Sequence, residues 1–525
     1  MNPIAKCYGI FYCQTGDMLP LAKTIDRQYC YCIYKLSILF ISFIFKCWHF
    51  NWGEMKKLIH DKSSTIMAYK TINPYNGQEV KIFDDFTDEM LEKKLQTAQD
   101  AYDNWRHSSF KERSKIVMQV ATLMREGADE LAKLITLEMG KRIKESKGEI
   151  ELSASIYEYY ANNAEAFLAD KKLEPQNGEA FIRTEPIGVL LGVEPWNYPH
   201  YQVARFAAPN IMAGNCILLK HASNVPQCAA AIEQLFKDAG APEGVYTNLY
   251  IPSAKIEKLV GHKIVKAVSL TGSEKAGASI AEAAGRNLKK SVLELGGSDP
   301  FIVLDDAEID KTVKWAVYGR MQNTGQACTA AKRFIVMDAV ADEFLEKFKA
   351  GLEKMEPGDP MDEKTKLGPL SSKTALEDLE EQVNRAVKEG AKVITGGKRY
   401  ERDGYFMQPT ILEGVESSNS VYHEELFGPV ALFYRVKSEA DAVALANDSP
   451  FGLGGAVFTA DEERGRKLAA KVNTGMMFIN HPTGSQPDLP FGGTKTSGYG
   501  RELSSLGIQE FVNKKLIRTS DINDK

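Results

Sequence analysis

The sequence predicts an α/β protein with two consecutive α/β units, each built on a largely parallel sheet. Short, continuous apolar segments alternate with longer segments of helical periodicity, a pattern typical of parallel strands covered on both faces. The length of 525 residues is enough for more than one domain with a buried core. The predicted strands form two series: 188–193, 215–220, 244–251, 267–272 and 291–295, then 300–307, 333–338, 391–397 and 428–436.

Helices are expected before the first strand series. From about residue 86 to 170 apolar residues recur at helical spacing, and Thr87 and Asp88 are suitable capping residues for the first helix. The next helical pattern ends at Gly140, a residue type common just after a helix. A shorter, partly alternating segment at 172–188 then predicts a hairpin arm.

The first 66 residues differ in composition from the rest of the chain. They carry eight Lys and Arg against four Asp and Glu, a net charge of +4, whereas the remaining residues carry −9. Their apolar segment Leu36–Phe45 has ten residues, and a bilayer span needs about 20. We interpret 1–66 as an atypical leader outside the mature fold, with Met67 as the true start. The alternative is a real extension that associates with a membrane.

Composition and charge argue against several classes of protein. The formal net charge of −5 and the lack of a basic tract argue against nucleic-acid binding. No CxxC pair or histidine-rich cluster predicts a metal site, and we expect no membrane partner for the body of the chain. After the leader only Cys216, Cys228 and Cys328 remain, too scattered for a disulfide framework, so we expect a reducing, cytoplasmic compartment.

Three residues could carry covalent chemistry. Cys328, in NTGQACTA, would be a strong nucleophile if its pKa were lowered or a base lay nearby. Glu294 ends an apolar strand segment and precedes two glycines, which allow a ligand or another strand to come close. The amide of Asn197, in EPWNYPH, could donate to an oxyanion. Taken singly, each has a simpler interpretation: a buried cysteine, a solvated turn glutamate and a turn asparagine.

Other segments are suited to phosphate and ribose. Lys220 ends a strand segment and Ser223 follows it, so both could contact either group, although Lys220 could instead be a surface lysine. The segment LTGSEKAG places Ser273 at a strand-to-helix junction, where free N–H groups favour phosphate. Glu425 and Phe427 lie on a predicted turn before a strand.

Together these motifs resemble the aldehyde dehydrogenase superfamily. PWNYP, LELGGSDP, NTGQAC, EELFGPV and PFGGTKTSGYGRE occur in that family's order and approximate spacing, across residues 67–520. The resemblance implies a Rossmann-like cofactor domain, an α/β catalytic domain and a small β oligomerisation arm, through which relatives form homodimers or homotetramers. It places the cofactor domain at 67–171 and 189–296, the catalytic domain at 297–500, and the oligomerisation segments at 172–188 and 501–520.

The resemblance also implies roles for single residues. Cys328 matches the nucleophile, Glu294 the general base and Asn197 the oxyanion donor. A thiolate would attack an aldehyde, a hydride would leave to the nicotinamide, and the base would activate the water that hydrolyses the thioester. Retention of this base disfavours a CoA-acylating variant. The residues implied to contact the cofactor are Trp196, Lys220, Ser223, Thr271, Gly272, Ser273, Glu425 and Phe427.

The choice of cofactor depends on Ser223. Relatives that prefer NAD commonly carry a glutamate at this place, which hydrogen-bonds the ribose hydroxyls and would repel a 2′-phosphate. Serine removes that repulsion, so NADP is favoured over NAD, although losing a barrier does not by itself create a phosphate site. His221 also departs from the proline that is common at its position.

The substrate is indicated by a closer resemblance. KHASNV and YQVARFAAPN are similar to bacterial succinate-semialdehyde dehydrogenases, in which Arg205 would bind the distal carboxylate and Ser485 would add a second contact. Some of those enzymes have a further arginine where this chain has Gln322. A broad aliphatic aldehyde dehydrogenase, with Arg205 in a structural salt bridge, is therefore an alternative. A non-catalytic role of the fold is a third, and it predicts the loss of at least one catalytic residue.

Overall fold

The computed structural model describes residues 69–523. The chain divides into two compact units, Met1–Ile66 and Met67–Lys525, and every described residue belongs to the second unit. The leader predicted at 1–66, with its apolar segment, lies outside the described residues. Between residues 69 and 523 no helix is both long and apolar enough to cross a bilayer.

The first sheet has six strands in the order β19-β9-β8-β5-β6-β7. Five run parallel, and β19, from within the range 297–500, returns to pair antiparallel with β9. β5 and β6 are buried at every residue, so their sequences are continuously apolar rather than alternating. The strands are β5 Val189–Glu194, β6 Cys216–His221, β7 Tyr246–Asn248, β8 Val265–Thr271, β9 Lys290–Glu294 and β19 Gly498–Tyr499.

All five segments predicted in the first series contain a strand, but the third strand is shorter than predicted. β7 occupies only Tyr246–Asn248 of the segment 244–251. The chain leaves the sheet just before Pro252, a residue that has no N–H to donate to a strand ladder.

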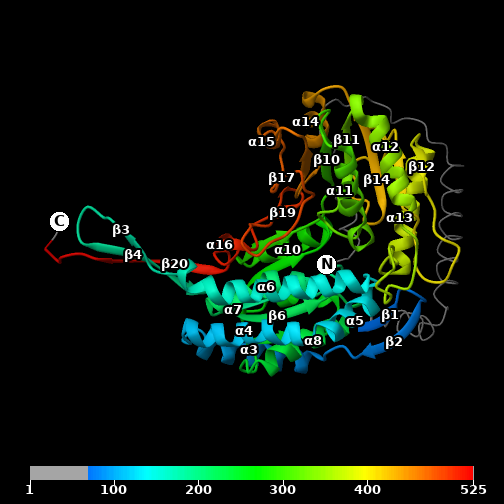
Figure 1. Cartoon of the computed structure of the whole chain (residues 1–525). Coiled ribbons are helices and arrows are strands. Elements are labelled where there is room, and N and C mark those ends of the chain that lie inside the picture. The colour runs from blue at the N-terminus through cyan, green and yellow to red at the C-terminus, as the bar shows by residue number, and fades with distance from the viewer. Residues whose placement is uncertain (1–68, 524–525) are drawn as a thin grey trace, which may run out of the picture. The chain divides into compact units, whose positions relative to one another are not determined.

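Helices cover this sheet as the periodicity predicts (Figure 1). Thr87 caps the first helix by accepting a hydrogen bond from the Met90 N–H, and Gly140 ends the third with a left-handed φ of 78°. The helices are α3 Asp88–Trp105, α4 Phe110–Glu126, α5 Ala128–Met139, α6 Ile143–Phe167, α7 Tyr201–Ala213, α8 Pro226–Asp238, α9 Ile256–Gly261 and α10 Glu274–Arg286.

The second sheet has seven strands in the order β12-β13-β14-β11-β10-β16-β17, of which only β12 runs antiparallel. The four strands predicted in the second series are present. β13, β16 and β17 were not predicted, because segments of two to four residues show no clear period. The strands are β10 Asp299–Val303, β11 Ala331–Met337, β12 Lys392–Thr395, β13 Thr410–Glu413, β14 Val430–Val436, β16 Ala456–Phe458 and β17 Phe478–Ile479. The helices are α11 Ile309–Met321, α12 Asp338–Glu353, α13 Lys373–Lys388, α14 Glu439–Asn447 and α15 Glu462–Ala469.

A three-stranded antiparallel arm extends away from both sheets (Figure 1). β3 (Lys171–Leu173) and β4 (Glu179–Pro186) form the hairpin predicted at 172–188. β20 (Val512–Thr519) pairs with β4 along the whole length of that strand. The role of this arm in oligomerisation stays a prediction.

Short elements complete the described fold. The hairpin of β1 and β2 was not predicted, because β2 is almost wholly exposed and shows no alternation of apolar residues. Tyr69 attaches it to the first sheet, since its hydroxyl donates to the Ile251 carbonyl at 2.9 Å. These elements are β1 Tyr69–Asn73, β2 Gln78–Phe83, β15 Phe451–Gly452, β18 Thr494–Lys495, α16 Ser504–Gly507 and the 3-10 turns Ser253–Lys255 and Gln322–Gly325.

The chain passes from the first sheet to the second in four residues. β9 ends at Glu294 and β10 begins at Asp299. A Cβ added to Gly297 would lie 2.5 Å from the Cys328 carbonyl oxygen and 3.2 Å from Leu453 Cβ. The glycine therefore permits a close approach, which is made here by another segment of the chain.

We predict that Gly297→Ala destabilises the protein more than Gly296→Ala. The new methyl group at 297 would meet a backbone oxygen, whereas the one at 296 would meet the carboxylate ends of Glu274 and Glu425, which can move. Overpacking of this kind costs about 1–3 kcal/mol of the free energy of unfolding. Urea unfolding followed by circular dichroism measures both variants, and equal midpoints would contradict the prediction.

Candidate active site

A cavity of about 820 Å³ brings together residues from α6, α7, α11, the segment 322–329, and β17 with the loop that follows it. Four residues singled out in the sequence line it: Arg205, Gln322, Cys328 and Ser485. The structure therefore places the predicted nucleophile and both predicted substrate contacts around one space.

Cys328 follows a strained loop. Asn323 and Thr324 have φ values of 52° and 56°, and Gly325 continues the left-handed turn at 77°. This conformation costs a non-glycine residue about 1–2 kcal/mol, so surrounding contacts must hold it. One such contact is the Asn323 N–H, which donates to Glu145 Oε1 at 3.0 Å.

The surroundings of Cys328 keep its thiol protonated at neutral pH. Burial raises the pKa of Cys328 to about 12; Arg205 and Lys332 lower it, while Glu425 and Asp299 raise it further. The structure therefore shows no lowered thiol pKa, and a reactive sulfur would need a base.

Glu294 is that candidate base. It ends β9 with only 2% of its surface exposed, so the alternative of a solvated turn residue is wrong. Burial, together with the charge of Glu502, raises the pKa of Glu294 well above its ordinary value. Neither carboxylate oxygen has a hydrogen-bond partner within residues 69–523. A carboxyl group with a raised pKa holds a proton more readily than an ordinary glutamate, as a general base requires.

Arg205 lies in the centre of a buried polar network. Its Nε is 2.7 Å from Glu502 Oε2, and the guanidinium stacks between the rings of Tyr201 and Phe491. Arg205 Nη1 donates to the Tyr201 hydroxyl at 3.2 Å, and that hydroxyl donates to Ser485 Oγ at 2.6 Å. Arg205 thus takes part in a salt bridge and also connects to Ser485 through Tyr201, a residue that sequence reasoning missed although the quoted segment YQVARFAAPN contains it.

Asn197 is held by a buried ion pair that carried no sequence signal. Its side-chain amide donates to the Gln326 carbonyl at 3.1 Å, two residues before the cysteine. Lys141 Nζ donates to the Asn197 carbonyl at 2.8 Å and forms a fully buried ion pair with Glu149. Glu149 Oε1 in turn accepts a hydrogen bond from the His200 N–H at 2.8 Å. The pair therefore fixes both ends of the loop that presents Asn197.

The residues predicted to contact the cofactor gather at one edge of the first sheet. Lys220 and Ser223 lie at the end of β6, and Thr271, Gly272 and Ser273 lie at the end of β8. β5 lies between these two strands, and the carboxyl edge of a parallel sheet is where such folds bind ligands. Ser273 caps α10, as expected, by accepting a hydrogen bond from Ala276 N–H at 3.4 Å.

Lys220 is a buried cation rather than a surface lysine. Only 7% of its surface is exposed, and burial lowers its pKa to about 8. Its ammonium group donates no hydrogen bond to any residue in the described range and lies 5.7 Å from the centre of the Tyr69 ring. A largely buried lysine whose ammonium donates to no described residue suits ribose hydroxyls or a phosphate at this edge.

The residues predicted on the nicotinamide side also come together. The rings of Trp196 and Phe427 meet edge to face with their centres 5.8 Å apart. Glu425 Oε1 accepts a hydrogen bond from the Gly297 N–H at 3.1 Å, next to the crossing between the sheets. Motifs far apart in the sequence are thus adjacent in space.

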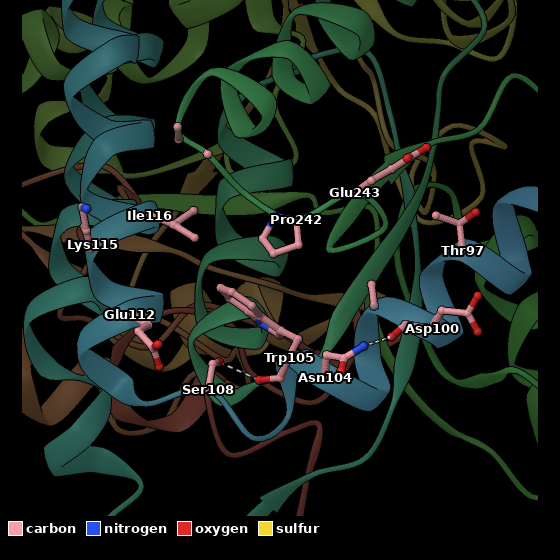
Figure 2. Close-up of a pocket in the computed structure, with 13 residues that line it drawn as sticks. Thr97, Asp100, Asn104, Trp105, Ser108, Glu112, Lys115, Ile116, Pro242 and Glu243 are labelled. Carbon is pink, nitrogen blue, oxygen red and sulfur yellow. Dashed lines mark hydrogen bonds between the residues drawn. The ribbon is translucent and has the colours of Figure 1, made fainter.

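A second cavity, of about 740 Å³, lies between α3, the start of α4 and the loop after α8 (Figure 2). Its polar groups are satisfied locally: Ser108 Oγ donates to the Trp105 carbonyl, and Glu112 accepts from the Ser109 N–H in a capping box. None of its lining residues belongs to the catalytic or cofactor sets, so the chemistry is centred on the cavity with Cys328.

The site combines a cysteine, a buried carboxylate and the carboxyl edge of a parallel sheet, close to the crossing between the two sheets. This combination is typical of an oxidoreductase that binds a dinucleotide. The chain belongs to the aldehyde dehydrogenase family, whose model matches residues 60–517.

Individual relatives are similar over nearly their whole length. The chain is 54% identical over 457 residues to the succinate-semialdehyde dehydrogenase [NADP(+)] of Deinococcus radiodurans, covering 87% of this chain and 96% of that protein. It is 46% identical to the probable succinate-semialdehyde dehydrogenase [NADP(+)] of a Synechocystis species, covering 86% and 99%. The crystal structure of succinic semialdehyde dehydrogenase from Streptococcus pyogenes in complex with NADP+ superposes with a TM-score of 0.85 at 45% identity, covering 86% and 100%. The predicted family and fold class are confirmed.

We predict that Glu149→Gln destabilises the protein by about 3–5 kcal/mol, because it leaves the Lys141 ammonium buried without a counter-ion. The double variant Lys141→Met/Glu149→Gln should recover stability but have a lowered kcat, since the Asn197 carbonyl loses the Lys141 donor and keeps only the Asn323 amide.

The matched control is Glu151→Gln on the same helix, where an exposed ion pair with Arg125 contributes at most about 1 kcal/mol. Urea unfolding and steady-state kinetics check both effects. A Glu149→Gln variant as stable as Glu151→Gln would refute the role of the Lys141–Glu149 pair in holding the loop that presents Asn197.

Proposed function

We propose that the chain is an NADP-dependent dehydrogenase that oxidises succinate semialdehyde to succinate through a thioester on Cys328. The observation that carries this proposal is the single cavity that contains Cys328 at one place and the Arg205–Tyr201–Ser485 chain at another. The first suits the aldehyde group and the second suits a distal carboxylate. The names of the most similar relatives support the same substrate and cofactor.

In the proposed mechanism Glu294 acts as the base twice. It takes the proton of the Cys328 thiol, and the sulfur forms a bond to the aldehyde carbon. The Asn197 amide and the Cys328 N–H donate to the resulting oxyanion. After Glu294 has returned its proton to solvent, it takes another from a water molecule whose oxygen attacks the thioester. The carbon–sulfur bond then breaks and releases the carboxylic acid.

The residues at the sheet edge fit a dinucleotide. The free ammonium of Lys220 and the hydroxyl of Ser223 suit ribose and phosphate oxygens, and the first turn of α10 at Ser273 favours a pyrophosphate. Glu425 and Phe427 would flank the other end of the cofactor. These residues would hold a nicotinamide that supplies a hydride acceptor for the carbon bonded to sulfur, which would convert the oxyanion adduct into the thioester.

NADP is the proposed cofactor because Ser223 carries no negative charge. Ser223 is half-buried and follows Lys220 by three residues, so a 2′-phosphate there would meet no carboxylate from residue 223 itself, although Asp85 lies near the Lys220 cation.

We predict that Ser223→Glu reverses the cofactor preference, because a carboxylate would repel the phosphate and bind the hydroxyls of NAD. The KM for NADP+ should rise at least about tenfold, a difference of about 1.4 kcal/mol. Ser223→Ala, which adds no charge, is the matched control and should keep the preference for NADP+. Initial rates of reduced-cofactor formation with each cofactor measure this, and an unchanged preference in Ser223→Glu would count against the assignment.

A broad aliphatic aldehyde dehydrogenase is the second candidate. Two observations favour it: Arg205 is already paired with Glu502, and Gln322 rather than an arginine lines the cavity. Carboxylate selectivity then depends on the hydroxyls of Tyr201 and Ser485 as well as on the guanidinium.

We predict that Ser485→Ala raises the KM for succinic semialdehyde about tenfold or more and leaves the KM for butanal nearly unchanged. A hydrogen bond to a charged group contributes about 1.5–3 kcal/mol, and only the first substrate carries the charge. Initial rates with the two aldehydes test this in the wild type and the variant. Equal effects on both substrates, or equal wild-type rates, would favour the broad dehydrogenase.

Assembly and compartment are part of the same proposal. β20 of the arm exposes Leu516 at 61%, an apolar side chain that a partner subunit would cover in a homodimer or homotetramer. The three cysteines in the described range are all unpaired, which supports a reducing, cytoplasmic setting.

A further inference from the structure

Lys332 is a buried lysine at the start of β11 that the mechanism above does not use. Only 1% of its surface is exposed. Its ammonium group donates to the carbonyl oxygens of Ala327 at 2.8 Å, Cys328 at 2.9 Å and Ala330 at 3.4 Å. One cation thus binds the backbone on both sides of the cysteine.

The same ammonium reaches the side of the site that faces the cofactor. Lys332 Nζ lies 2.9 Å from Glu425 Oε1, the oxygen that also accepts from the Gly297 N–H. It also lies 5.9 Å from the centre of the Phe427 ring. Three segments therefore meet at Lys332: the cysteine loop, the crossing between the sheets and the turn before β14.

We propose that Lys332 is a positioning residue that holds the Cys328 backbone in place and ties it to Glu425. This inference rests on the proposed function, since it takes Cys328 as the nucleophile and Glu425 as a cofactor contact. The lysine and the glutamate carry opposite charges and act on the thiol in opposite directions.

The charged groups around the thiol act on its pKa in two directions, so the opposite effects of Lys332 and Glu425 can be measured. Arg205, from α7, and Lys332 favour the thiolate, whereas Glu425 and Asp299 disfavour it. Arg205 is already paired with Glu502. Asp299 is fixed by hydrogen bonds from Thr483 and Gly454, and the phenols of Tyr198 and Tyr201 stay neutral because burial raises their pKa. A single substitution of Lys332 or Glu425 therefore changes the balance of charges that acts on the pKa of the Cys328 thiol.

The experiment compares Lys332→Met and Glu425→Gln in the full-length chain. The rate of alkylation of Cys328 by iodoacetamide is measured from pH 6 to 10 by mass spectrometry of the peptide that contains it, because the thiolate is the reacting form. We expect Lys332→Met to slow alkylation at a fixed pH about tenfold and Glu425→Gln to speed it by a similar factor, one pKa unit in each direction.

Two control variants accompany these measurements. Lys314→Met, an exposed lysine on α11, should leave the rate unchanged. Lys332→Met should also lower kcat, because the Ala327 and Cys328 carbonyls lose their donor. Lys332→Gln keeps hydrogen-bond donors without the charge, so it should recover part of that kcat while its alkylation stays slow. If Lys332→Met does not fold, the acceleration expected in Glu425→Gln still tests the proposal.

The role of Lys332 would be overturned if the alkylation rates of Lys332→Met and Glu425→Gln shifted in the same direction, or if neither rate changed. Failure of the proposed function is distinguishable, because it would appear as dehydrogenase activity retained by Cys328→Ser.

Discussion

The site depends on the short crossing between the two sheets. Between Glu294 and Asp299 the chain leaves one sheet and enters the other, and Gly297 has no side chain to keep the Cys328 segment away. Glu294, the proposed base, ends β9, and Cys328, the proposed nucleophile, precedes β11, so the crossing connects the two sheets that contain these strands. The residues proposed to contact the cofactor, at the ends of β6 and β8, belong to the same sheet as Glu294.

The second organising factor is the cost of burying charge. Glu194, Glu294 and Glu502 share the guanidinium of Arg205, with Arg501 also near Glu294, and burial raises the pKa of all three carboxyl groups. A site with more carboxylates than cations retains protons, which is useful for a group that must accept and return one. Each buried cation therefore interacts with several partners: Lys332 donates to three carbonyls and forms an ion pair with one carboxylate.

The parts of this structure that sequence could predict are those with a local signal. Continuous apolar segments predicted β5 and β6, and the family motifs pointed to Cys328 and Glu294. The residues that hold the site loops in place had no such signal, because the sequence alone predicts that a lysine such as Lys141 or Lys332 lies on the surface. Their placement depends on contacts with segments far along the chain: Lys141 reaches a carbonyl 56 residues away. Predicting them would need the tertiary structure itself.

The left-handed turn at Asn323 and Thr324 has a consequence for how the protein loses activity over time. Its strain of about 2–4 kcal/mol lies just before Cys328 and is held by tertiary contacts, among them the hydrogen bonds from the Asn323 N–H to Glu145 and from the Thr324 hydroxyl to the Gly368 carbonyl. On warming, this loop should relax before the sheets do. Loss of turnover would then precede any loss of helical circular dichroism, and the functional lifetime of the protein would be set by about three residues rather than by its core.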